Sequence, residues 1–126
     1  MPLVRISVQQ GQHAQQHTKI GDAVHRAMVE TINVPALDRF QLITEHAPAD
    51  FTFDATYLNI ARTNALVMIQ ITLNTGRTVE MKKALYKRIA DLLHEELKIR
   101  KEDVLLNLVE VPKENWSFGN GEAQYA

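Results

Sequence analysis

The chain has 126 residues, a length typical of one domain, and its 45% hydrophobic and 23% charged residues are ordinary for a globular protein. A net charge of −1 gives no basic field that would attract nucleic acid or an anionic membrane. The absence of cysteine excludes disulfides, thiolate metal sites and a cysteine nucleophile. No apolar run approaches the roughly 18 residues of a membrane span, and no signal peptide is evident. We therefore expect a cytoplasmic protein.

The first part of the chain predicts a strand, a helix and a second strand. Residues 3–8 carry the apolar and β-branched side chains of a short strand, and Gly11 begins a polar break after it. Apolar residues recur at three- and four-residue spacing over 20–32, which indicates a helix with one apolar face that Pro35 ends. Residues 39–46 then predict the second strand.

The second part repeats this order after an irregular segment. Residues 47–64 predict a loop that packs against the domain. Residues 65–73 are almost continuously apolar, which is typical of a strand covered on both faces. Thr78 is suited to cap the start of a helix that extends to residue 97. Residues 104–111 predict another strand of the buried type, and the residues after 115 form an irregular tail.

Two strand–helix–strand units in tandem predict a duplicated βαβ arrangement of α+β class. A long crossover helix favours parallel pairing inside each half. We expect one domain over residues 1–126, with halves at about 2–46 and 65–111 and four strands in one sheet. Two amphipathic helices would cover one face of that sheet. The other face of such apolar strands would be bare, which points to oligomerisation.

Pro2 is the first candidate for chemistry. Removal of Met1 would leave a chain that starts with a secondary amine, and an α-amino group titrates at about 7.7–8.0 in model peptides. Burial and nearby cations lower that pKa, whereas nearby carboxylates raise it. Such an amine can act as a general base, a general acid or a nucleophile. Position alone does not distinguish it from an unremarkable second residue.

Three segments carry a resemblance to a known family: MPLVRISV at the start, NVPALDRFQ before the second strand, and NWSFGNGEAQY near the end. With nearly the whole chain in the same order and spacing, the sequence resembles the malonate semialdehyde decarboxylase group of the tautomerase superfamily. The resemblance implies a tandem βαβ fold that assembles as a homotrimer. It also implies catalysis by an amino-terminal proline, which here is Pro2.

Two charged residues are the next candidates. Asp38 matches the family's aspartate after the first helix, and the resemblance implies that it bonds to the proline region or positions water. Arg77 follows a Gly turn and precedes a helix, where a guanidinium and free backbone N–H groups suit a carboxylate. The family subgroup has two arginines here, but this chain has only Arg77, and Asn74 or Thr75 stands in the other place. We expect Arg77 to bind the carboxylate of a substrate.

The tail supplies the remaining candidates. The resemblance implies that Trp116 and Phe118 form the apolar wall of a small pocket, although both residues are also suited to plain packing. Tyr125 is a candidate hydrogen-bond donor to substrate, although its place beside the C-terminus favours fraying. Arg62 also falls at a matching arginine, without an assigned role.

Metal and cofactor chemistry is not indicated. His13 and His17 are four residues apart, but no third ligand follows at a suitable spacing. The predicted reaction is proton transfer or C–C cleavage alpha to a carbonyl in a small carboxylated oxo acid. Keto–enol tautomerisation and decarboxylation both fit. The alternatives are a hydratase or dehalogenase acting on an unsaturated acid, and a non-catalytic trimeric binding module of the same fold.

Overall fold

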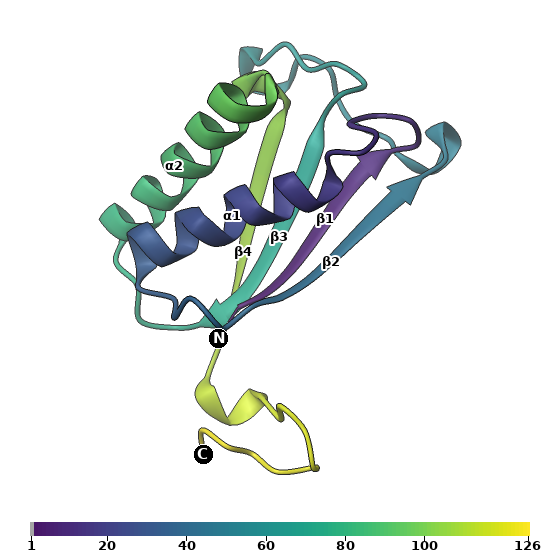
Figure 1. Ribbon diagram of the computed structural model, residues 1–126. Helices are drawn as coiled ribbons and strands as arrows, with labels where there is room; N and C mark the ends of the chain where they lie inside the picture. The colour runs from purple at the N-terminus through teal and green to yellow at the C-terminus, as the bar shows by residue number, and fades with distance from the viewer. Residues whose placement is uncertain (1) are drawn as a thin grey trace.

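The computed structural model describes residues 2–126 as two successive βαβ units and a C-terminal tail (Figure 1). The first unit contains strand β1 (Leu3–Gln9), helix α1 (His17–Ile32) and strand β2 (Phe40–His46). The second contains β3 (Val67–Asn74), α2 (Val79–Leu97) and β4 (Val104–Val111). The predicted element order and α+β class are confirmed.

The four strands form one mixed sheet in the order β2-β1-β3-β4. Each βαβ unit pairs its own strands in parallel, and β1 meets β3 antiparallel at the centre. Leu3 is opposite Phe40 on one side and Thr72 on the other. The start of β1, the start of β2 and the end of β3 therefore lie at the same end of the sheet.

Helices α1 and α2 lie on the same face of the sheet (Figure 1). Helix α1 starts at His17, one turn earlier than its apolar spacing suggests, and Asn33 ends it in a left-handed conformation. At the start of α2, the Thr78 side chain accepts a hydrogen bond from the Met81 backbone N–H, which confirms the predicted cap. Both helices and the inner sheet face share one core of fully buried aliphatic residues, which includes Ile6, Ile20, Met28, Ile69, Ile71, Leu85, Ile89 and Leu93.

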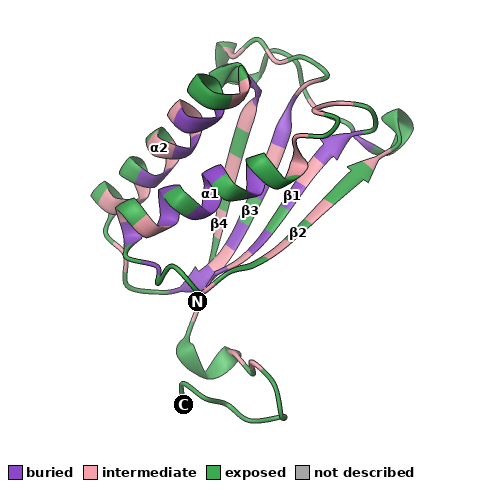
Figure 2. Cartoon of the chain, in the orientation of Figure 1, coloured by how far each residue is buried: buried purple, intermediate pink, exposed green. Residues whose placement is uncertain are grey.

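The opposite sheet face is mixed in character. Within one chain, burial alternates along β3 and β4 (Figure 2), so this face is open, as expected for two helices on one side. The Gln70 amide donates to Asn107 across this face at 3.0 Å. Leu42 and Leu105, by contrast, leave apolar surface exposed. A run of nine mostly apolar residues concealed this alternation, because Met68 and Thr72 are compatible with either face.

The loop between the units contains two short 3₁₀ turns, at Pro48–Asp50 and Tyr57–Asn59. The fully buried Asp103 carboxylate holds its end by accepting from the Thr63 backbone N–H and hydroxyl, both at 2.7 Å. Within residues 2–126, no helix is both long and apolar enough to cross a membrane.

Candidate active site

Pro2 is buried where the chain enters β1. It lines a cavity of about 270 Å³ at the end of the sheet, together with Leu3, Phe40, Trp116, Ser117 and Phe118. Because β1 is a central strand, its start is flanked by β2 and β3 on either side. The fold thus encloses the second residue of the chain between two strands and the C-terminal tail.

An aromatic cluster from the tail forms one wall of this cavity. The Trp116 and Phe118 rings are stacked, with centroids 5.3 Å apart and planes at 13°. Tyr125 meets Phe118 edge to face at 5.0 Å, but 43% of Tyr125 is exposed. The Trp116 indole N–H donates to the Asn74 side-chain oxygen at 2.7 Å, which ties the cluster to the end of β3.

Asp38 lies in the turn between α1 and β2. Its backbone N–H donates to the Pro35 carbonyl at 3.0 Å, so the turn fixes the residue close to the start of β2. Burial raises the pKa of the Asp38 carboxyl above its ordinary value of 3.8, although the charges of the amino terminus, His25 and Arg77 act in the opposite direction. A half-buried carboxyl whose charged form is disfavoured by burial is a candidate for proton chemistry.

Arg77 joins the two βαβ units near this carboxyl. Its guanidinium donates through Nη1 to the Asn74 carbonyl at 3.1 Å and through Nη2 to the Ile32 carbonyl at 3.4 Å. Ile32 is the last residue of α1, so the cation also lies at the negative end of a helix. These bonds use two of the five guanidinium N–H donors and fix the orientation of the group.

The structure brings most of the predicted residues to one end of the sheet. Pro2, Trp116 and Phe118 line the same cavity, whereas Asp38 and Arg77 interact electrostatically with each other but do not line it. Tyr125 reaches the site only through Phe118. The sequence predictions missed Phe40, which was assigned only to a strand.

Two further missed residues are His25 and Asn74. His25 is buried, and its Nε2 is 2.8 Å from the Ala36 carbonyl, within the turn that carries Asp38. Asn74 contacts both Trp116 and Arg77. The sequence suggested only a surface or a satisfied core histidine at position 25, and only the fold shows that His25 acts electrostatically on Asp38.

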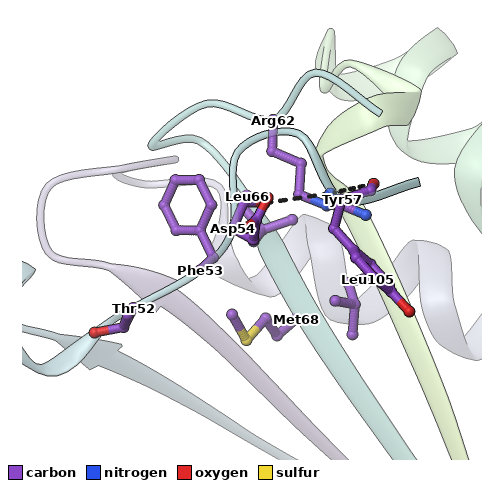
Figure 3. A pocket seen from close by; sticks show the side chains of 8 residues that line it. All are labelled: Thr52, Phe53, Asp54, Tyr57, Arg62, Leu66, Met68 and Leu105. Atoms are coloured by element: carbon purple, nitrogen blue, oxygen red, sulfur yellow. Dashed lines mark hydrogen bonds between the residues drawn. The ribbon is translucent and has the colours of Figure 1, made fainter. Parts of the chain in front are cut away.

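Arg62 lies at the opposite end of the sheet, in a separate pocket of about 230 Å³ (Figure 3). Its Nη1 donates to the carbonyls of Asp54, Tyr57 and Ile60 at 3.0–3.3 Å. All three acceptors belong to the loop between the two units. Arg62 therefore holds that loop together and does not reach Pro2.

No group of three or more His, Asp or Glu side chains among residues 2–126 has an arrangement that would hold a metal ion. His13 and His17, the pair singled out by spacing, instead lie 2.7 Å from the Ala65 carbonyl and 3.4 Å from the Gln12 carbonyl, respectively. Both rings are thus occupied in holding the loop before α1.

The chain matches known protein families over most of its length. Two models described as tautomerase enzymes match the chain, one over residues 38–119 and the other over residues 2–59. The chain belongs to the tautomerase family. The Probable tautomerase YusQ of Bacillus subtilis is 44% identical over 98% of this chain and 98% of its own. The Probable tautomerase YrdN of the same organism is 34% identical over 99% of this chain and 96% of its own.

Solved structures of tautomerase-fold proteins agree with the architecture. A malonate semialdehyde decarboxylase has a TM-score of 0.90 and 32% identity, covering 98% of this chain and 95% of that chain. A second malonate semialdehyde decarboxylase, inhibited by 3-bromopropiolate, has a TM-score of 0.90 and 36% identity. The match covers 98% of this chain and 93% of that one. A fused 4-OT symmetric trimer has a TM-score of 0.77 and 27% identity. The match covers 98% of this chain and 97% of that one. The predicted resemblance to this group is confirmed.

Proposed function

We propose that this tautomerase-family chain catalyses the keto–enol tautomerisation of a small carboxylated oxo acid, with Pro2 as its catalytic group. The observation that carries the proposal is the burial of Pro2 in an aromatic-walled cavity, beside a half-buried carboxyl and an oriented guanidinium. The free amine requires removal of Met1, which lies outside the described residues. An apolar cavity excludes water, so an amine inside it exchanges protons with a bound molecule.

The proposed reaction needs one proton carrier. The neutral secondary amine of Pro2 accepts the proton of the enol hydroxyl and becomes a secondary ammonium. The ammonium then returns that proton to the carbon, which yields the ketone and restores the amine. Atoms and charges balance without a cofactor, and no cofactor is invoked.

Three other residues have supporting roles in this proposal. Arg77 binds the substrate carboxylate through its remaining guanidinium donors. Asp38, a half-buried carboxyl in the turn before β2, holds the proton or a water near the Pro2 amine. Trp116 and Phe118 enclose the substrate, and Tyr125 supports Phe118 from the edge. Pro2, Asp38 and Arg77 thus form the proposed catalytic set.

Decarboxylation of a 3-oxo acid is the second candidate, because two malonate semialdehyde decarboxylases have the same fold over nearly the whole chain. It would need Pro2 as the ammonium, which polarises the carbonyl while the C–C bond breaks and CO₂ leaves. The bonding electrons form an enolate, and the ammonium proton then passes to its α-carbon. The single arginine favours this form, because a second cation would lower the pKa of the amine further. Hydration or dehalogenation of an unsaturated acid would use the same ammonium.

We also propose a cytoplasmic homotrimer, in which the open sheet face contacts the other copies. The exposed apolar residues of that face, Phe40, Leu42, Leu105 and Val109, support an interface. The similar fused 4-OT structure is a symmetric trimer. Light scattering at micromolar concentration should give three times the chain mass, and a stable monomer would contradict the proposal.

The function is tested by substrate competition between reaction classes. The protein is assayed with the enol of an aryl 2-oxo acid, a 3-oxo acid and an unsaturated acid, alongside Pro2→Ala and a variant that retains Met1. We expect the enol to give the highest kcat/KM, and blocking the amine to lower it by at least about 100-fold, the usual scale of general acid–base catalysis. Faster CO₂ release would establish the decarboxylase instead. If no substrate is turned over in any assay, the chain would instead be a non-catalytic binding module of the same fold.

A further inference from the structure

The C-terminal tail meets the rest of the molecule through very few polar contacts. Residues 113–126 extend beyond the end of the sheet (Figure 1). Within residues 2–126, the bond from the Trp116 indole to Asn74 is the one side-chain hydrogen bond that joins this tail to the βαβ units. The other tail bonds are internal, such as the Gln124 side-chain bonds to Phe118 and Gly119. The position of the aromatic wall therefore depends on Asn74.

The indole group also fixes how the Asn74 amide is oriented. An indole N–H only donates, so the atom that it contacts at 2.7 Å must be the amide oxygen and not the nitrogen. Asn74 is buried at the last position of β3, opposite Val111 of β4. Its side chain is therefore held by the sheet on one side and by Trp116 on the other.

The backbone of the same residue contacts Arg77. The Asn74 carbonyl accepts from Arg77 Nη1 at 3.1 Å. One residue thus contacts the aromatic tail through its side chain and the guanidinium through its main chain. Among residues 2–126, no other residue forms hydrogen bonds with both Arg77 and Trp116.

We propose that Asn74 is a positioning residue that couples the aromatic tail to the anion-binding arginine and holds Trp116 over Pro2. The part concerning turnover rests on the proposed function, whereas the part concerning the tail does not. The position of the aromatic wall relative to the sheet then depends on the one hydrogen bond between Trp116 and Asn74.

The tail is tested first by fluorescence, because Trp116 is the one tryptophan of the chain. Asn74→Ala removes the acceptor, so we expect a red-shifted emission, faster acrylamide quenching and lower anisotropy. Asn74→Asp keeps an oxygen that accepts from the indole N–H, so it should restore the wild-type spectrum. Asn64→Ala, an exposed asparagine before β3, is the matched control and should change nothing. Circular dichroism checks that each variant folds.

Steady-state kinetics then distinguish the effect of the tail from the effect on the Arg77 guanidinium. Asn74→Ala should lower kcat/KM for the enol acid about fivefold to tenfold, the scale of one neutral hydrogen bond. Asn74→Asp should retain an ordered tail but raise KM, because its carboxylate competes for Arg77. Asn74→Ala with unchanged emission, quenching and anisotropy would overturn the coupling. If Asn74→Ala changes the fluorescence of a protein that does not turn over the enol, the proposed function is overturned, whereas the positioning of Trp116 by Asn74 is supported.

Discussion

The two ends of the sheet each hold a cavity, an arginine and an aspartate, but they use these groups differently. At the far end, Arg62 bonds three loop carbonyls within eight residues of its own position (Figure 3). Hydrogen bonds from Thr56 and Tyr57, with the charge of Arg62, hold the pKa of Asp54 below its ordinary value. Both charged groups there stabilise the loop.

The Pro2 end has the opposite character. Burial raises the pKa of Asp38, and Arg77 reaches across 45 residues of sequence to the end of α1. The carboxyl is held where its charged form is disfavoured, which is typical of a group retained for chemistry. The comparison shows that an arginine in a pocket does not by itself mark a binding site; the proposal for the Pro2 end rests on the buried Pro2, its cavity and the half-buried Asp38 together.

The largest expected effect is a difference in KM between variants of Arg77 and Arg62. Arg77→Ala removes a charge-assisted contact of about 1.5–3 kcal/mol, so we expect a rise in KM of roughly 10- to 150-fold for a carboxylated substrate. Arg62→Ala should leave KM unchanged and make the 51–64 loop more sensitive to protease, because its carbonyl bonds are lost. Steady-state kinetics and limited proteolysis measure both. Equal KM increases in the two variants would remove the distinction between the ends.

A smaller effect concerns the two aspartates: replacing each by Asn should change Tm at neutral pH in opposite directions. Because the folded-state pKa of Asp38 is raised, its ionisation lowers stability; this loss is absent below about pH 3.8 and complete above the raised pKa. Asp38→Asn should therefore raise Tm at neutral pH. Asp54 has a lowered pKa, so its contribution is present above pH 3.8 and is lost as pH falls through the folded value.

Asp54→Asn should accordingly lower Tm at neutral pH and leave it unchanged in strong acid. Calorimetry of both variants from acid to neutral pH measures the two slopes. A neutral-pH loss of stability in Asp38→Asn as large as that in Asp54→Asn would show that Asp38 is a structural residue. Only Asp38→Asn should also reduce turnover.

The sequence predicted the strands and helices because hydrophobic spacing and helix caps are local signals. Thr78 and Pro35 have the same meaning in any fold of this class. Which residues of β3 face the helices was less evident from the sequence, because Met68 and Thr72 on either side of Gln70 are compatible with a buried or an open face.

The site was predicted only in part, and mainly through resemblance. Motifs identified Pro2, Asp38 and Trp116, which lie far apart in the sequence. The contact between Asn74 and Trp116 spans 42 residues, and that between Arg77 and Ile32 spans 45, so no local pattern contains either. The first depends on the register of β3 with β4 and the second on how the two units pack, and spacing along the chain specifies neither.

The central claim is that a free Pro2 amine transfers the proton, and titration of that amine tests it most directly. The natively expressed protein, labelled with ¹⁵N-proline, is weighed intact and followed by NMR from acid to alkaline pH alongside kcat/KM for the enol acid. We predict a mass without Met1, and one titrating proline nitrogen, absent in Pro2→Ala, whose midpoint coincides with a limb of the rate profile. Retained Met1, or a silent Pro2 nitrogen with undiminished turnover, would contradict the claim.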